Sequence, residues 1–274
     1  MKLITIFSGK GGVGKTSMSI LLASWLKYEL HERVIVYDFE SPEPRLLNKR
    51  NYDISLLENK NQVLTELSKG NVFYPIGRIP AYPQGYSEAA LMRIVDGIEQ
   101  SKATGDGYII CDFPGRFEAR EAIYSIASRG LIDLIAFPIQ QEDQSIASML
   151  ATCKILRQPG FIEGTSNKNS QDILCFWNMI TRNDTRSKID NLGKYEVLFK
   201  AMNIPVSRTR VRYTDTVKRN SSAPVFVTTT VCYPKQFMLR AFPPEEKGSD
   251  KPYIEALFQE IKDRVDGTWE DRSI

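Results

Sequence analysis

Short apolar runs alternate along the chain with longer segments in which apolar residues recur at helical spacing. The short runs are rich in β-branched residues, which is typical of strands that are buried on both faces. They cover residues 2–8, 33–37, 108–111 and 131–137, with a weaker run at 173–179. The helical patterns lie near residues 15–30, 86–103, 117–129, 142–157 and 184–202. This alternation predicts a doubly wound, mostly parallel α/β sheet with helices on both faces.

Two polar segments interrupt this pattern, at residues 159–172 and 241–252. A strand follows the first segment at once, so we interpret it as a loop and not as a domain boundary. After the second, apolar residues recur at helical spacing from Ile254 to Val265. The polar face of this last helix is mainly acidic, which favours packing in the core over binding to an anionic membrane surface. We therefore expect residues 1–274 to form one domain.

Composition narrows the class of protein. The 274 residues are 42% hydrophobic and 25% charged with a net charge of +3, which excludes a disordered or collagen-like chain. No apolar run reaches the ~18 residues of a membrane helix. The N-terminus lacks a signal-peptide layout, so we expect a cytoplasmic protein without an integral membrane segment. The four cysteines have no CxxC spacing, and the one histidine, His31, is interpreted as a surface or capping residue.

A glycine-rich segment directly follows the first predicted strand. It reads GKGGVGKT and satisfies both GxGxxG, a dinucleotide-binding pattern, and GxxxxGK[ST], the phosphate-binding P-loop. Lys15 and Thr16 favour the P-loop, which needs a cation for the β- and γ-phosphates and a hydroxyl for Mg²⁺. Backbone N–H groups of such a loop converge on phosphate at the positive end of the next helix. The predicted nucleotide-binding residues of this segment are Gly9, Lys10, Gly11, Gly12, Val13, Gly14, Lys15, Thr16 and Ser17.

The additional lysine, Lys10, makes the segment resemble the deviant Walker A motif of the ParA/MinD family of P-loop ATPases. This resemblance implies ATP and Mg²⁺ as cofactors. It also implies a nucleotide-dependent homodimer in which Lys10 reaches the phosphates of the partner subunit, so Lys10 and Lys15 are both expected to be catalytic. The nitrogenase iron protein belongs to the same family, but the cysteines of this chain lack its cluster-binding context.

Acidic residues end two of the predicted strands. Asp38 and Glu40 resemble the family's switch I, in which the first acid orients Mg²⁺-bound water and the second positions the attacking water. Glu40 is one methylene longer than the usual aspartate, which predicts slow or differently aligned hydrolysis. Asp112 resembles the Walker B acid, Gly115 the start of switch II with an N–H for the γ-phosphate, and Asn178 a residue that reads adenine. The implied Mg²⁺ ligands are Thr16, Asp38 and Asp112.

Each of these assignments has a structural alternative. Glu40 would then be a solvated loop acid, and Asp112 would cap a helix. Lys10 would be a solvated loop lysine without a role in catalysis.

Basic residues cluster between positions 208 and 219, where Asp215 is the one acid. Three arginines alternate there, so on a strand they would share one face. Such a stripe suits contact with phosphates without sequence readout, but it equally suits a solvated strand edge that resists aggregation. The predicted residues for binding non-specific DNA are Arg208, Arg210, Arg212, Lys218 and Arg219.

These features together predict a Mg²⁺-ATPase that dimerises on ATP, binds DNA or an unidentified activating protein, and is reset by hydrolysis. The switch sequences resemble ParA-type partition proteins and the TraA-like proteins of conjugative transposons, which implies DNA partitioning or mobile-element transfer. Three alternatives stay open. They are a biosynthetic enzyme similar to dethiobiotin synthetase or cobyrinate amidase, a MinD-like positioning ATPase, and a nucleotide-binding scaffold that scarcely hydrolyses ATP.

Overall fold

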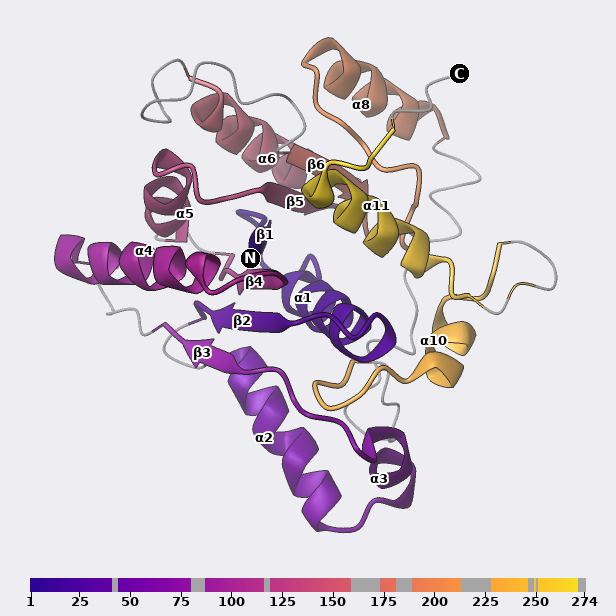
Figure 1. Ribbon diagram of the computed structural model, residues 1–274. Coiled ribbons are helices and arrows are strands. Elements are labelled where there is room, and N and C mark those ends of the chain that lie inside the picture. Colours follow the sequence, from indigo (N-terminus) through magenta and orange to yellow (C-terminus); the bar gives the residue numbers. More distant parts are fainter. Residues whose placement is uncertain are drawn as a thin grey trace.

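A parallel sheet lies at the centre of the computed structural model (Figure 1). The structure describes residues 1–40, 44–79, 87–115, 119–158, 173–180, 189–212, 228–245, 249 and 251–270. Six strands of this part of the chain form the sheet in the order β3-β2-β4-β1-β5-β6, and all neighbouring pairs are parallel. The strands are β1 (Lys2–Ile6), β2 (Val34–Asp38), β3 (Ile76–Arg78), β4 (Tyr108–Asp112), β5 (Leu134–Ile139) and β6 (Ile173–Trp177).

Helices cover both faces of the sheet, which confirms the predicted doubly wound α/β fold (Figure 1). They are α1 (Lys15–Ser24) with a π-helical turn η1 (Trp25–Glu29), α2 (Arg45–Glu58), α3 (Gln62–Ser68), α4 (Glu88–Ala103), α5 (Ala119–Ser128), α6 (Asp143–Leu156), α8 (Ile189–Ala201), α10 (Lys235–Ala241) and α11 (Ile254–Asp266). Successive strand residues point to opposite faces. Ile4 and Ile6 of β1 therefore pack with α1 and α11, whereas Leu3 packs with the side of α4, α5 and α6.

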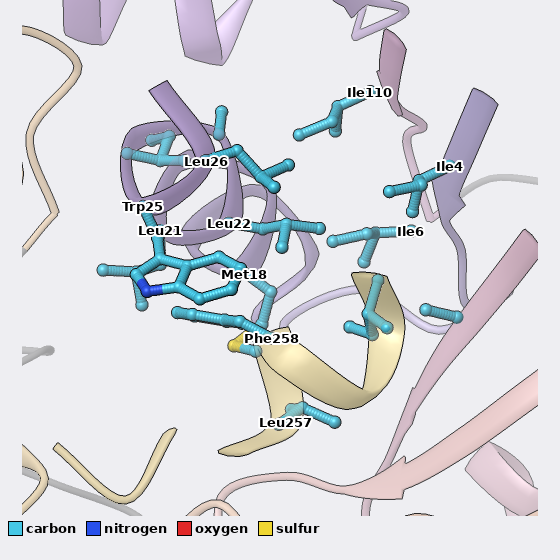
Figure 2. Packing of buried hydrophobic residues seen from close by; sticks show 14 of the residues in the cluster. Ile4, Ile6, Met18, Leu21, Leu22, Trp25, Leu26, Ile110, Leu257 and Phe258 are labelled. Carbon is cyan, nitrogen blue, oxygen red and sulfur yellow. The ribbon is translucent and has the colours of Figure 1, made fainter. Parts of the chain in front are cut away.

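The last helix is a core element. Ile254, Leu257, Phe258 and Ile261 have no exposed surface, so the expectation of core packing is confirmed. Figure 2 shows Phe258 against Trp25 of η1, and their ring centroids lie 5.8 Å apart. Among the described residues, no helix is long and apolar enough to cross a membrane.

The helix predicted over residues 15–30 is present, but its second half is π-helical. Regular α-helix ends at Ser24, and the next turn is wider, with the N–H of Leu30 donating to the carbonyl of Trp25 at 3.2 Å. This turn lets Trp25 pack on α11 and lets the hydroxyl of Tyr28 donate to the Thr230 carbonyl at 2.8 Å. Tertiary contacts, which periodicity does not report, decide the geometry here. His31 follows the turn with φ 58° and is exposed, in line with its interpretation as a surface residue.

The hydrophobic pattern missed α2, α3, α10 and the three-residue edge strand β3. The reason is clear for α2, whose inward face buries Arg50 and Asp53 beside Leu46. Arg50 donates from Nη2 to the Thr230 carbonyl at 2.9 Å, and Asp53 accepts from the Thr230 N–H at 2.8 Å. Because both charges are satisfied by partners far along the chain, a polar face is stable in the interior. The predicted loop 159–172 lies outside the described residues, and α10 runs up to the start of the loop predicted at 241–252.

Removing the Phe258 ring is expected to destabilise the protein strongly. Phe258→Ala leaves a cavity between α11 and η1, which costs about 3–5 kcal/mol of unfolding free energy. Denaturant titration monitored by circular dichroism measures this loss. Val72→Ala is the control, since that side chain is 76% exposed and its removal should change stability by less than about 0.5 kcal/mol. Equal effects of the two substitutions would contradict the described core.

Candidate nucleotide-binding site

The glycine-rich loop follows the central strand at the carboxyl edge of the sheet. β1 pairs with β4 on one side and with β5 on the other, and Ile6 lies in register with both Asp112 and Ala136. Open parallel sheets bind ligands at this edge, where successive connections leave in opposite directions. The loop therefore lies beside the segments that follow β4 and β5, which bring Gly115 and Glu142 close to it.

Gly14 joins the loop to α1 in a conformation that favours glycine. Its φ is 84°, and it is the N-cap of α1. A Cβ here would lie 2.7 Å from Nδ2 of Asn178. That amide donates to the carbonyl of Val13 at 2.7 Å, and Asn178 is only 4% exposed. The side chain of Asn178 thus supports the loop backbone, while its role in reading adenine stays a prediction.

Gly9, at the start of the loop, lies directly against α6. A Cβ at this position would be 2.1 Å from Oγ of Ser148 and 3.0 Å from Nη2 of Arg120. Arg120 of α5 donates to the same Ser148 oxygen at 3.1 Å. A larger residue here would force the Ser148 side chain to move, so glycine lets the loop lie this close to α6.

Both lysines of the loop are held by protein atoms. Lys15 is 7% exposed and donates from Nζ to the carbonyl of Lys10 at 2.8 Å. Burial lowers the pKa of Lys15, and the charges of Asp112 and Glu40 oppose this shift. The ammonium of Lys10 forms an ion pair with Glu142, which directly precedes α6.

Asp112 is a fully buried carboxylate at the end of β4. Its Oδ1 accepts from the hydroxyl of Ser19 at 2.9 Å, while its buried Oδ2 has no hydrogen-bond partner in the described part of the chain. Burial raises the pKa of Asp112 to about 7, although the hydroxyls of Thr16 and Ser19 and the charge of Lys15 favour the ionised form. An unsatisfied oxygen beside two hydroxyls fits the water shell of Mg²⁺, which binds through few carboxylates and keeps several waters.

Asp38 ends β2 in register with Asp112 of β4, and Glu40 lies two residues beyond the end of β2. The carboxylate of Asp38 accepts from the backbone N–H groups of Glu40, Leu46 and Leu47 at 3.0, 2.9 and 3.1 Å. It therefore holds the start of α2, whose first N–H groups have no partner within the helix. Burial raises the pKa of Asp38, and these backbone hydrogen bonds oppose the shift.

Glu40 is 8% exposed and lies 3.6 Å from Nη2 of Arg45. Its charge acts on Lys15. The described geometry therefore does not resemble a solvated loop acid, and the role of Glu40 in positioning water stays a prediction. Residues 41–43, which follow it, lie outside the described part of the chain.

Gly115 also reaches the P-loop. A Cβ there would lie 2.8 Å from both the carbonyl oxygen of Lys10 and the N–H nitrogen of Gly11. The start of the predicted switch II thus contacts the loop backbone, and its hydrogen bond to a γ-phosphate stays a prediction.

The predicted basic cluster lies away from the P-loop, beside β6. Residues 205–212 run beside this strand and the residues after it, with two isolated parallel bridges (Cys175 to Val206 and Ile180 to Arg212) instead of a regular strand. The alternation nevertheless holds, since Ser207 and Val211 are buried. The exposed residues between and after them are Arg208, Arg210 and Arg212. Lys218 and Arg219 lie outside the described residues.

Some of these arginines have partners on α8. Arg210 forms an ion pair with Glu196 at 2.9 Å. Arg208 and Arg210 also line a cleft of about 540 Å³, together with Lys200 and Glu196 of α8. This face therefore carries several cations but is partly neutralised by Glu196.

Sequence reasoning missed five polar residues that contact the site. Ser19 lies one helical turn after Lys15 on α1, and this spacing could have predicted that it faces the site. Glu142 follows a predicted strand, as Asp38 and Asp112 do, and could have been predicted on that ground. Nothing in the local pattern marks the others. The five are Ser19, Arg45, Arg120, Glu142 and Ser148.

The fold and the site define a P-loop nucleotide-binding protein of the doubly wound α/β class. Residues 4–223, more than half of the chain, match the CobQ/CobB/MinD/ParA nucleotide binding domain. The chain belongs to this family, as the GKGGVGKT segment predicted. No curated protein sequence matches the chain.

Solved structures support the same assignment of fold. The ParA protein of pNOB8 is 17% identical with a TM-score of 0.56, over 97% of this chain and 98% of that one. The same protein bound to nonspecific DNA is 18% identical with a TM-score of 0.56, over 98% and 99%. The MinD cell division protein of Aquifex aeolicus is 15% identical with a TM-score of 0.54, over 97% and 96%. At such identities the likeness concerns the fold alone.

Replacing Asp112 by asparagine is expected to stabilise the protein at alkaline pH when nucleotide and metal are removed. The folded-state pKa of about 7 lies above the usual value, so wild-type stability falls as pH rises from about 4 to 7 and stays lower above that. The Asp112→Asn variant has no carboxylate to ionise here and does not lose this stability. We therefore expect its free energy of unfolding to exceed that of wild type by about 1–4 kcal/mol at pH 8. Chemical denaturation in EDTA across this pH range measures it.

Asp96→Asn, at an exposed position of α4, is the control and should show no such pH-dependent gain. With Mg²⁺ and ATP, wild type should gain more thermal stability than Asp112→Asn. An Asn variant that is less stable than wild type at every pH would contradict the buried, costly carboxylate.

Proposed function

We propose that the protein is a Mg²⁺·ATP-dependent molecular switch that dimerises on ATP and binds DNA without sequence specificity. The observation that carries this proposal is the convergence of Lys15, Asp112 and Glu40 at the edge of the sheet, with a second P-loop lysine, Lys10, partly exposed beside them. A plain phosphate-binding loop needs one lysine, so a second one favours a site that is shared between two subunits.

The residues of the site have distinct roles in this proposal. The N–H groups of residues 9–17 and the ammonium of Lys15 bind the phosphates. Thr16, Asp112 and Asp38 would hold Mg²⁺, directly or through water, and the ion would neutralise charge on the β- and γ-phosphates. Glu40 orients the attacking water, and Lys10 stabilises the phosphates of the partner subunit.

Asp38 offers a route by which nucleotide would change the conformation. Its carboxylate holds the N–H groups of Leu46 and Leu47 at the start of α2. If this carboxylate turned away to help hold Mg²⁺, it would release these N–H groups, so occupancy of the site and the position of α2 would be linked. This is a two-state arrangement of the kind that γ-phosphate contacts bias in other switches.

The proposed DNA surface is the segment 205–212, which is anchored firmly below its arginines. Ser207 donates to Oε2 of Glu260 at 2.6 Å, and the N–H of Val211 donates to the carbonyl of Trp177 at 2.8 Å. Exposed guanidinium groups on a fixed backbone suit contact with phosphates. That a protein of this fold, the ParA of pNOB8, has been solved with nonspecific DNA supports the choice of ligand.

The biological setting that we propose is DNA partitioning or transfer of a mobile element in the cytoplasm, with an activating protein partner that promotes hydrolysis. The two-lysine P-loop supports this setting over small-molecule biosynthesis on the same scaffold. Stimulation of ADP release by a carboxylic acid substrate would instead favour the biosynthetic alternative.

Binding to arbitrary duplex DNA is expected with Mg²⁺·ATP and not with ADP, and it should be lost in Lys10→Ala. Replacing Arg208, Arg210 and Arg212 by alanine should weaken binding at least 10-fold and lower the slope of log affinity against log salt by about 2–3. Fluorescence anisotropy over a salt series measures both quantities.

A matched control removes three cations elsewhere. The exposed residues Lys69, Arg93 and Arg129 can be replaced by alanine with the same change in net charge, and the salt slope should then stay within about 1 of wild type. Absence of DNA binding in either nucleotide state would refute the DNA part of the proposal.

Shortening the switch I acid tests its proposed role in hydrolysis. Glu40→Asp restores the length that is usual in the family, and we expect turnover to rise about 10-fold because placement of the attacking water improves. Glu40→Gln keeps the length but removes the charge and should lower turnover. Phosphate release under saturating ATP measures both, and an Asp variant as slow as the Gln variant would show that the longer acid is correctly placed.

A further inference from the structure

Lys10, the second lysine of the P-loop, is bound by its own chain. Its ammonium forms an ion pair with the carboxylate of Glu142, the N-cap residue of α6. The side chain of Lys10 is 21% exposed and that of Glu142 is 54% exposed. The pair therefore lies at the surface beside the P-loop, where a second molecule can reach it.

The fold brings these residues together independently of their charges. β1 and β5 are neighbours in the sheet, so the loops that follow them lie side by side at its carboxyl edge (Figure 1). Ser148 of α6 also lies directly beside the P-loop, since a Cβ on Gly9 would be 2.1 Å from its Oγ. An acid at the N-terminus of α6 is also favoured by the helix dipole, so Glu142 is stable there with or without Lys10.

We propose that Glu142 is a positioning residue that retains Lys10 in its own protomer, so that ATP-dependent dimerisation has to break this ion pair in both subunits. The inference rests on the proposed function, in which Lys10 reaches the phosphates of the partner. One ammonium cannot occupy both places. Glu142 thereby raises the protein concentration at which dimers form.

Nucleotide binding by the monomer is not affected in this scheme. Lys15, and not Lys10, is the cation for the phosphates bound by the same chain. Lys15 donates to the backbone carbonyl of Lys10, whereas Glu142 pairs with the side-chain ammonium of Lys10. Exposed ion pairs are weak, so losing two of them changes a dimerisation constant by about 2- to 30-fold.

Glu142→Gln tests the proposal, because it keeps the size of the side chain and removes its charge. Analytical ultracentrifugation with Mg²⁺ and a non-hydrolysable ATP analogue measures the dimerisation constant. At low salt we expect the variant to dimerise about 2- to 30-fold more tightly than wild type, with unchanged affinity of the monomer for nucleotide. The difference should shrink in 0.5 M salt, which screens exposed pairs. Equal or weaker dimerisation of the variant overturns the proposal.

Two further variants separate this effect from a general effect of charge. Glu99→Gln removes an exposed acid from α4 and should leave the dimerisation constant unchanged. In a Lys10→Ala background, Glu142→Gln should have no effect. A gain that persists without Lys10, or that Glu99→Gln reproduces, overturns the proposal.

Chemical labelling tests the contact without any dimer. Acetylation of Lys10 by an amine reagent, followed by mass spectrometry in the absence of nucleotide, should be faster in Glu142→Gln than in wild type. Equal labelling overturns the proposed pair. Faster labelling without dimerisation of either protein in the ATP analogue would support the ion pair. It would contradict the proposed function, and with it the proposed effect of Glu142 on dimerisation.

Discussion

The P-loop is held between neighbours that approach its backbone more closely than a side chain would allow. Ser148 occupies the space of a Cβ at Gly9, and Asn178 occupies that at Gly14. The loop therefore packs closely against α6 and against the residue that follows β6. This packing positions Lys10 and Lys15 relative to the acids around them. Precise placement of this kind is what phosphate chemistry requires of a binding loop.

Charge burial at the carboxyl edge shows that the site is built at the expense of stability. Asp112 is fully buried, and one of its carboxylate oxygens has no hydrogen-bond partner in the described part of the chain. Burial raises the pKa of Asp112 and lowers the pKa of Lys15, and both shifts favour the neutral forms. A core built for stability alone would contain apolar residues at these positions. Functional sites commonly keep buried charged groups of this kind, and a ligand of opposite charge stabilises their ionised forms. Here the buried ammonium of Lys15 suits a phosphate, and the buried carboxylate of Asp112 suits a divalent cation.

The P-loop and the basic segment 205–212 each hydrogen-bond to one of two neighbouring residues at the end of β6. Asn178 donates to the P-loop carbonyl of Val13, and the neighbouring residue, Trp177, accepts from Val211 in the segment that carries the arginines. A change at the P-loop and a change at the basic segment would therefore both act on residues at the end of the same strand.

Sequence by itself determined five strands of the sheet (β1, β2, β4, β5 and β6), most of the helices that cover it, the P-loop and the acids that end β2 and β4. These features depend on hydrophobic periodicity and on short-range backbone rules, which a single sequence displays. It also placed Arg208, Arg210 and Arg212 on one exposed face, although the segment is less regular than expected. The polar inward face of α2 and the π turn at η1 did not follow from the pattern, because distant partners stabilise both.

Only the tertiary structure decided which groups hold the site residues. Lys10 meets Glu142 across 132 positions of sequence, and Asn178 meets Val13 across 165. Asp38 turned out to hold the start of α2 through backbone hydrogen bonds. Such pairings depend on the strand order β4-β1-β5-β6, which brings the loops after separate strands together. Local sequence carries no record of that order, because it arises from how the strands share one sheet.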